Sequence, residues 1–122
     1  HLKCKIVQNQ TTRYGKLMYI SPERLKAHTN HISFCAYQDD VYSLGVILYC
    51  MFFGSAPYDT PSEESKAFNS IMNDQWIQNI KKNNNHSWIP NSAFDLINRI
   101  LKYENRRINI NQILNHNWMK FN

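Results

Sequence analysis

The chain has 122 residues, 43% of them hydrophobic, so it has the size of one small domain or of a part of a larger one. Fourteen Lys and Arg against nine Asp and Glu give a formal net charge of +5, but the basic residues are scattered and form no stripe, which argues against a nucleic-acid partner. Three cysteines at irregular spacing favour free thiols in a reducing compartment over a disulfide framework.

Membrane, secretion and metal signals are weak. No charged segment followed by an apolar one opens the chain, so we expect no signal peptide and an intracellular, cytoplasmic location. The apolar run 41–53 has 13 residues, too few for the ~20 that a membrane-spanning helix needs. His28, His31 and Cys35 fit no standard zinc finger and lack a fourth ligand, so we expect no metal in this chain.

The first half of the chain predicts a loop and two helices. Residues 1–14 have no clear period and carry the hydroxyls of Thr11, Thr12 and Tyr14. Ser21-Pro22-Glu23 predicts a helix start, with Ser as N-cap and Pro in the first position. Two aspartates precede a helix over 41–53, which is apolar enough to be buried on all sides and which Gly54 ends.

The second half predicts about three further helices, each with one apolar stripe. Thr60-Pro61-Ser62-Glu63 has the pattern of a capping box, Ser92 is a candidate cap for the next helix, and Asn109 with Gln112 is a candidate capping box for the last. The fold class is therefore mainly α. Its stripes are too few to surround the helix over 41–53, so we expect polypeptide outside this chain to pack there.

Three motifs in series resemble the protein kinase family. "YGKLMYISPE" is similar to the end of the kinase activation segment, "DDVYSLGVILYCMFFGSAPY" to the central helix that follows it, and "AFDLINRILKYENRRINI…ILNHNWM" to the closing helices. The resemblance covers almost the whole chain. It implies an incomplete kinase-like C-terminal lobe, from the family's αEF helix to its αI helix, with an activation segment and substrate loop at 1–23, a buried central helix at 39–54 and a helical subdomain at 60–122.

The resemblance also implies roles for individual residues. The loop that receives the substrate residue after the phosphorylated one matches Gly15, Lys16, Leu17, Met18, Tyr19, Ile20 and Ser21. Three charged residues match positions that support the active site: Glu23, its expected partner Arg107 (with Arg106 as second choice), and Asp40, which in the family holds the catalytic loop. Phosphorylation sites that switch kinases on are expected at Thr11, Thr12 or Tyr14.

The chain departs from the family pattern at several points. Lys16 stands where Ser/Thr kinases usually have Thr, Tyr42 replaces Trp, Ser21 replaces Ala, and Glu104-Asn105 replaces Asp-Pro. The glycine-rich loop, its Lys, the catalytic Asp and the Mg²⁺-binding Asp are absent, so we expect no catalytic residue and no cofactor in this chain and predict that it is inactive alone.

The function implied is therefore that of a larger protein. A parent Ser/Thr kinase, using ATP and Mg²⁺, would phosphorylate protein substrates, and this piece would supply the substrate loop and scaffold. Its partners are then the protein substrate and the remainder of the kinase domain. The alternative is a pseudokinase or helical interaction module, which Lys16 favours.

Overall fold

The computed structural model describes residues 6–7, 17–83 and 86–120, and the described part is mostly helical. Its α-helices are α1 (Pro22–Asn30), α2 (Ala36–Phe53), α3 (Lys66–Met72), α4 (Trp76–Lys81), α5 (Asn91–Ile100) and α6 (Ile110–Leu114). Short 3-10 helices occur at η1 (Leu17–Tyr19), η2 (Glu104–Arg106) and η3 (Asn117–Met119). Strands β1 (Ile6–Val7) and β2 (Phe34–Cys35) pair antiparallel. The predicted fold class, mainly α, is confirmed.

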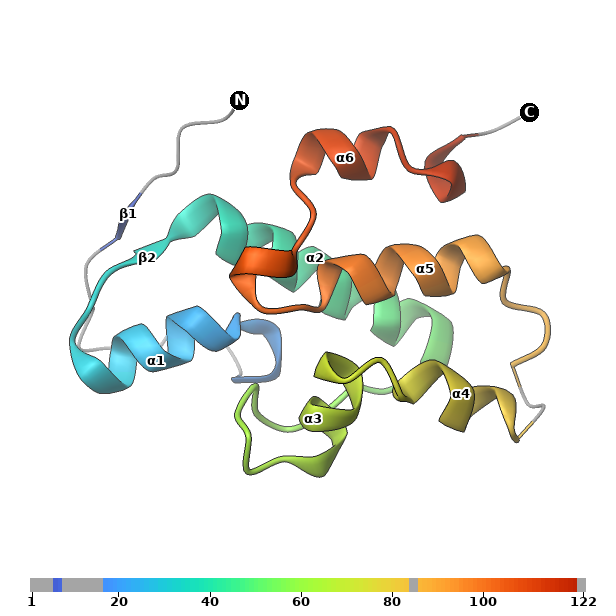
Figure 1. Cartoon of the computed structure of the whole chain (residues 1–122), viewed down its shortest axis with the longest axis horizontal. Coiled ribbons are helices and arrows are strands. Elements are labelled where there is room, and N and C mark those ends of the chain that lie inside the picture. The colour runs from blue at the N-terminus through green and yellow to red at the C-terminus, as the bar shows by residue number, and fades with distance from the viewer. Residues whose placement is uncertain (1–5, 8–16, 84–85, 121–122) are drawn as a thin grey trace.

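Helix α2 crosses the middle of the molecule with α5 alongside it, and the other helices lie around this pair (Figure 1). One core cluster joins Tyr42 and Val46 of α2 to Phe94 and Ile97 of α5. A second cluster joins Val41 to buried side chains of α5 and α6, namely Leu96, Ile100 and Ile113. The core therefore lies between α2 and the C-terminal helices.

Gly45 lets α2 and α5 approach closely. A Cβ added at Gly45 would lie 2.9 Å from Leu101 Cδ2 and would also clash with the side chain of Ile100. The absence of a side chain at this position is therefore a packing requirement of the α2–α5 contact.

Helix α2 starts earlier than predicted and ends where predicted. It begins at Ala36 instead of residue 41, so both aspartates lie inside the helix and Asp39 is buried. At the other end, Gly54 has a φ of 74° and its N–H donates to the Cys50 carbonyl at 2.8 Å, which confirms the left-handed cap. None of the described helices is both long and apolar enough to cross a bilayer.

Two predicted helix caps are confirmed. The Ser21 side chain accepts a hydrogen bond from Arg24 N at 3.1 Å, with Pro22 in the first position of α1. In α6, the Asn109 side chain accepts from Gln112 N at 2.9 Å and the Gln112 side chain accepts from Asn109 N at 2.8 Å. The starts of α1 and α6 could be predicted from the local sequence, because an N-cap forms within one turn and needs no distant contact.

Two other predicted caps are wrong. Helix α3 begins at Lys66, and its N-cap is Ser65, which accepts from Phe68 N at 3.2 Å. Thr60 instead contacts the Ser62 hydroxyl at 3.2 Å within a turn. Ser65 is as good a cap by type and places Phe68 in the core, so tertiary packing chooses between the two starts. Helix α5 begins at Asn91 after Pro90, so Ser92 lies inside the helix.

The cysteine expectation is partly wrong. Cys50 is a free thiol, whereas Cys35 is disulfide-bonded. Disulfide formation depends on which sulfur atoms the fold brings together, and irregular spacing in the sequence does not show this.

Buried Lys102 ties the end of α5 to the end of α3. Its side chain is 3% exposed, and Nζ donates to the Ile71 carbonyl at 2.6 Å and to Asn98 Oδ1 at 2.7 Å. It also pairs with Asp74 at 3.0 Å, a residue with a φ of 63°. Burial lowers the pKa of Lys102, and the hydrogen bond from Lys102 lowers the pKa of Asp74. These contacts hold the backbone just after α5, before the segment that carries Arg107.

Candidate functional site

The described part of the predicted substrate loop lies directly against α2. Leu17, Met18 and Tyr19 form η1 and are half-buried, whereas Ile20 and Ser21 are buried. The Tyr19 ring packs against the main core cluster, and the Tyr19 carbonyl accepts a hydrogen bond from the Ser43 hydroxyl at 2.7 Å. The predicted loop residues Gly15 and Lys16, and the predicted phosphorylation sites Thr11, Thr12 and Tyr14, lie outside the described residues.

Glu23, two residues beyond the loop, forms a two-pronged ion pair with Arg107. Arg107 Nη1 lies 2.6 Å from Glu23 Oε2, and Arg107 Nη2 lies 2.7 Å from Glu23 Oε1. The Arg107 side chain is fully buried, while that of Glu23 is 17% exposed. Parallel hydrogen bonds between a guanidinium and a carboxylate fix orientation as well as distance.

Arg107 also holds backbone of two other segments. It donates from Nη1 to the Gln38 carbonyl at 2.9 Å, and from Nε and Nη2 to the Lys102 carbonyl at 3.1 and 2.8 Å. Its guanidinium carbon lies 4.8 Å from the centre of the Tyr42 ring. One side chain therefore joins α1, the start of α2 and the segment after α5.

Arg106, the second candidate for this role, faces elsewhere. Its Nη2 lies 3.4 Å from Asp74 Oδ2, and both side chains are about half exposed. The sequence left the choice between the two arginines open because the stretch before them is one residue shorter than the family pattern.

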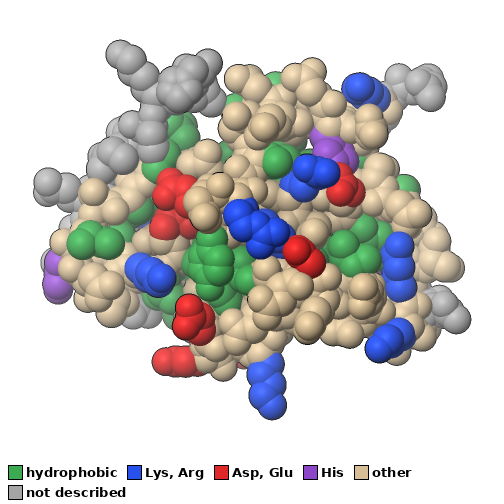
Figure 2. Space-filling view, viewed as in Figure 1, with side chains coloured by type: hydrophobic (Ala, Val, Ile, Leu, Met, Phe, Trp, Pro, Cys, Tyr) green, Lys and Arg blue, Asp and Glu red, His purple; other side chains and the backbone are tan. Residues whose placement is uncertain are grey.

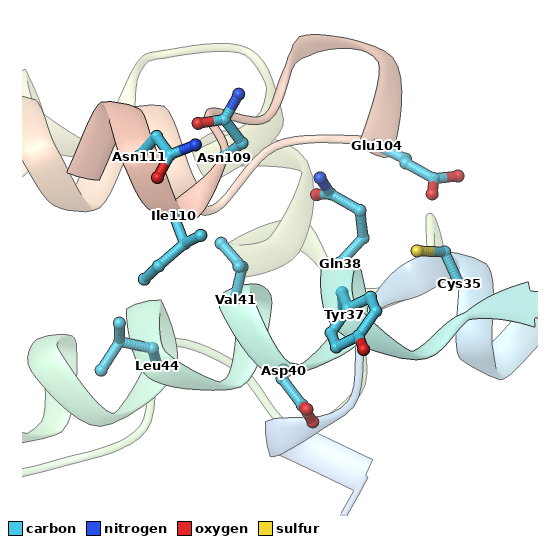
Figure 3. Close-up of a pocket in the computed structure, with 10 residues that line it drawn as sticks. All are labelled: Cys35, Tyr37, Gln38, Asp40, Val41, Leu44, Glu104, Asn109, Ile110 and Asn111. Atoms are coloured by element: carbon cyan, nitrogen blue, oxygen red, sulfur yellow. The ribbon is translucent and has the colours of Figure 1, made fainter. Parts of the chain in front are cut away.

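Asp40 is exposed and lies at the edge of a pocket of about 520 Å³ between α2 and α6. Figure 3 shows Val41 and Ile110 pointing toward one another across this pocket, while the Asp40 carboxylate points away from α6. The Asp40 carboxylate has no hydrogen-bond partner within the described ranges, and the buried Gln38 Oε1 has none there either.

Asp39, expected only as one of two acids before the central helix, contacts the predicted substrate loop. Asp39 Oδ1 accepts from Ser21 N at 2.9 Å, and Asp39 Oδ2 lies 3.1 Å from Arg24 Nη1. The sequence features that could have indicated this contact are Asp39, a second acid beside Asp40, and Arg24, which follows Glu23. The family patterns do not include either residue, because one pattern ends at Glu23 and the next begins at Asp40.

The substitution at Tyr42 creates a buried pair of phenols. The Tyr42 and Tyr58 hydroxyls are hydrogen-bonded to each other, and both side chains are buried in the main core. Burial raises the pKa of both phenols above the usual value for tyrosine. The nearby Glu104 carboxyl also has its pKa raised by burial.

The described residues contain no candidate metal site, and the face in Figure 2 shows no basic stripe. No group of three or more His, Cys, Asp or Glu side chains among the described residues could hold a metal ion, so we assign no Mg²⁺ position to them. On the face in Figure 2, Lys and Arg side chains are spread out and acidic side chains lie among them.

The described geometry agrees with the family comparisons. The family model of the protein kinase domain matches residues 2–119, so the chain belongs to the protein kinase family. Its relatives include serine/threonine kinases. Mouse testis-specific serine/threonine-protein kinase 2 is 35% identical over 107 residues, which cover 87% of this chain and 27% of that protein.

Two further relatives come from a yeast and a plant. The Aurora kinase of Schizosaccharomyces pombe is 31% identical over 114 residues, covering 90% of this chain and 28% of that kinase. The calcium and calcium/calmodulin-dependent serine/threonine-protein kinase of Lilium longiflorum is 31% identical over 109 residues, covering 87% and 19%. This chain thus spans less than a third of the length of these relatives.

Proposed function

We propose that this chain is the C-terminal part of the catalytic domain of a protein serine/threonine kinase. The whole protein transfers the γ-phosphate of ATP to a Ser or Thr hydroxyl of a protein substrate, with Mg²⁺, as kinases of this family do. Residues 1–23 serve as activation segment and substrate loop, 39–54 as central helix and 60–122 as helical subdomain. The chain itself contributes the substrate loop and its support, and is inactive alone.

The observation that carries this proposal is the Glu23–Arg107 ion pair. It joins α1, which begins just after the substrate loop, to the C-terminal segment, and Arg107 also holds the start of α2 through the Gln38 carbonyl. An ion pair at this place restricts the loop to one conformation, which a loop that binds a peptide through its backbone requires. The Ser43–Tyr19 hydrogen bond supports the same loop from α2.

The remainder of the kinase domain is the proposed partner for the uncovered face of α2. Along this face Ile47 is 46% exposed and Met51 is 74% exposed. Asp40 lies on the same side by helical spacing and offers an acceptor without a donor within the described ranges. In the proposed whole domain, apolar side chains cover Ile47 and Met51, and backbone N–H groups of the catalytic loop reach Asp40.

The test begins with the transcript upstream of the His1 codon. A coding sequence with a glycine-rich loop and its Lys, a catalytic Asp and a Mg²⁺-binding Asp supports the kinase proposal. The encoded protein is then tested for phosphate transfer from ATP to a Ser-containing protein such as casein. We expect Asp40→Ala to reduce the rate at least tenfold and Asp59→Ala, at an exposed acid in the α2–α3 loop, to leave it unchanged.

The second candidate function is a scaffold without catalysis, and Lys16 favours it. A Lys at the position of the usual Thr cannot accept a hydrogen bond and adds positive charge near the catalytic groups. A folded whole protein that binds partners but transfers no phosphate, or a reading frame that opens near His1, supports this candidate and contradicts the first.

A further inference from the structure

Helix α2 contacts the backbone of the substrate loop at two points. The Ser43 hydroxyl donates to the Tyr19 carbonyl at 2.7 Å, and the Ser21 N–H donates to Asp39 Oδ1 at 2.9 Å. Asp39 and Ser43 are four residues apart, so they lie on one face of the helix. One side chain supplies a donor and the other an acceptor, and together they hold both ends of the Tyr19–Ser21 backbone.

Asp39 is buried, with 3% of its surface exposed, so its charge needs compensation. Arg24 supplies it, with Nη1 at 3.1 Å from Asp39 Oδ2. The Arg24 side chain is fixed in turn, since its guanidinium carbon lies 5.6 Å from the centre of the Phe34 ring. The two carboxylate oxygens of Asp39 therefore have different partners: Oδ1 accepts from the Ser21 amide and Oδ2 pairs with Arg24.

Ser21 is held through its backbone and its side chain. Its N–H is bonded to Asp39, and its hydroxyl accepts from Arg24 N at 3.1 Å as the N-cap of α1. Arg24 thus contributes its backbone N–H to Ser21 and its side chain to Asp39. The result is a closed set of contacts among three residues at the junction of substrate loop, α1 and α2.

We propose that Asp39 is a positioning residue that fixes the carboxyl end of the substrate loop through the Ser21 amide. This inference rests on the proposed kinase function. It concerns a different residue from Asp40, which is exposed on another side of α2. Asp39 acts on the substrate loop through one backbone N–H, and Arg24 pairs with its other carboxylate oxygen.

The expected consequence is a change in substrate binding rather than in phosphate transfer. The loop contacts the substrate residue after the phosphorylated one, so a loop that samples more conformations binds the peptide more weakly. The ATP phosphates and the reacting hydroxyl are held by other segments of a kinase domain. Loss of the Asp39 contact therefore raises the KM for protein substrate and leaves kcat and the KM for ATP nearly unchanged.

Two double variants of the whole kinase distinguish the effect of the hydrogen-bond acceptor at residue 39 from the effect of the Arg24–Asp39 ion pair. Arg24→Gln with Asp39→Asn removes both charges but keeps an oxygen that accepts from Ser21 N–H and an amide that faces Gln. Arg24→Leu with Asp39→Leu also removes both charges but leaves no acceptor. Neither variant leaves an unpaired buried charge, so both are expected to fold.

We expect the Leu pair to raise the KM for a peptide substrate about tenfold, the effect of losing one hydrogen bond to a charged group, with kcat within about twofold. The Gln/Asn pair should keep KM within about twofold of the unmodified kinase. Equal KM increases in the two variants, or no increase in the Leu pair, overturn the proposal. So does a fall in kcat with KM unchanged.

A second readout does not depend on activity. Amide hydrogen exchange at Ser21, measured by NMR in the same proteins, should be at least about tenfold faster in the Leu pair and close to the unmodified rate in the Gln/Asn pair. If the unmodified protein transfers no phosphate, the kinase proposal fails, and the exchange rates alone decide the role of Asp39. Unchanged exchange at Ser21 in the Leu pair contradicts that role.

Discussion

Glu23 and Arg107 are 84 positions apart in the chain and form two parallel hydrogen bonds of 2.6 and 2.7 Å. Arg107 also holds the carbonyls of Gln38 and Lys102, so the ion pair joins segments that lie far apart in the chain. The start of α1, just after the predicted substrate loop, the start of α2 and the C-terminal segment are therefore held at one buried point.

Replacing Arg107 by Ala should cost about 3–5 kcal/mol of the free energy of unfolding, because Glu23 and two carbonyls lose their partner in a mostly buried site. The measurement is urea unfolding of a protein that includes the upstream part of the domain. Arg106→Ala is the matched control, since Arg106 is 53% exposed and pairs with a half-exposed Asp74. We expect the control to change stability by less than about 1 kcal/mol. Equal losses in the two variants would contradict the assignment of Arg107 as the buried partner.

The uncovered face of α2 predicts how the isolated chain behaves. With Ile47 at 46% and Met51 at 74% exposure, we expect the 122 residues alone to be partly folded and prone to aggregate. Size-exclusion chromatography with light scattering should give mixed oligomers, and Ile47→Lys with Met51→Lys should shift them toward monomer.

Ile32→Lys is the control for this prediction, because Ile32 is also about half exposed but lies outside α2. If aggregation follows the α2 face, the control keeps the oligomers of the unmodified chain. A monomeric chain with a sharp, cooperative thermal transition would show that the exposed face of α2 is stable in water without a further part of the domain packed on it.

The sequence predicted the helical class and those features that depend on neighbouring residues. Ser21 before Pro22, Gly54 after an apolar run and Asn109 with Gln112 each determine a helix end through contacts within one turn. Thr60 failed because Ser65 offers an equivalent cap and only the burial of Phe68 chooses between them.

The contacts of the candidate site were predictable only in part. The pairing of Glu23 with an arginine follows from motif spacing, whereas the choice of Arg107 over Arg106 needs the direction in which each side chain leaves the chain. Asp39 could not be found, since its contacts with Ser21 and Arg24 exist only once α1 has folded back onto α2.

Stability should fall at alkaline pH because of Tyr42 and Tyr58. Burial raises the pKa of both phenols, so the folded protein keeps protons that the unfolded chain releases above about pH 10. Where the folded state binds more protons, the free energy of unfolding decreases as pH rises, by up to about 1.4 kcal/mol per pH unit for each phenol. Below about pH 10 this loss is absent.

Urea unfolding of the protein that includes the upstream part of the domain checks this prediction, through the difference between its free energies of unfolding at pH 8 and at pH 10.5. Tyr58→Phe should reduce the pH-dependent loss because one titrating phenol is gone, whatever its effect on stability at pH 8. Tyr37→Phe is the control, since Tyr37 is about half exposed on α2. A pH-dependent loss that Tyr58→Phe does not reduce would contradict the role of the buried pair.

The contact between α2 and α5 predicts that Gly45→Ala is destabilising even though Ala is the better helix former. Helix propensity favours Ala by about 1 kcal/mol, but overpacking in a close contact costs about 1–3 kcal/mol. The added Cβ would lie 2.9 Å from Leu101 Cδ2 and would clash with Ile100, so the two central helices must separate. We therefore expect a net loss of about 1 kcal/mol in urea unfolding.

A double-mutant cycle with Ile100→Ala tests the cause. Shortening Ile100 makes room for the new Cβ, so the two substitutions together should cost less than the sum of their separate effects, by at least about 0.5 kcal/mol. Gly54→Ala is the matched control: it meets no atom within 4 Å but adopts a φ of 74°, which strains Ala. Its loss should add to that of Ile100→Ala without coupling. Additive losses for Gly45→Ala would mean that the clash with Ile100 is not what limits residue size at this crossing.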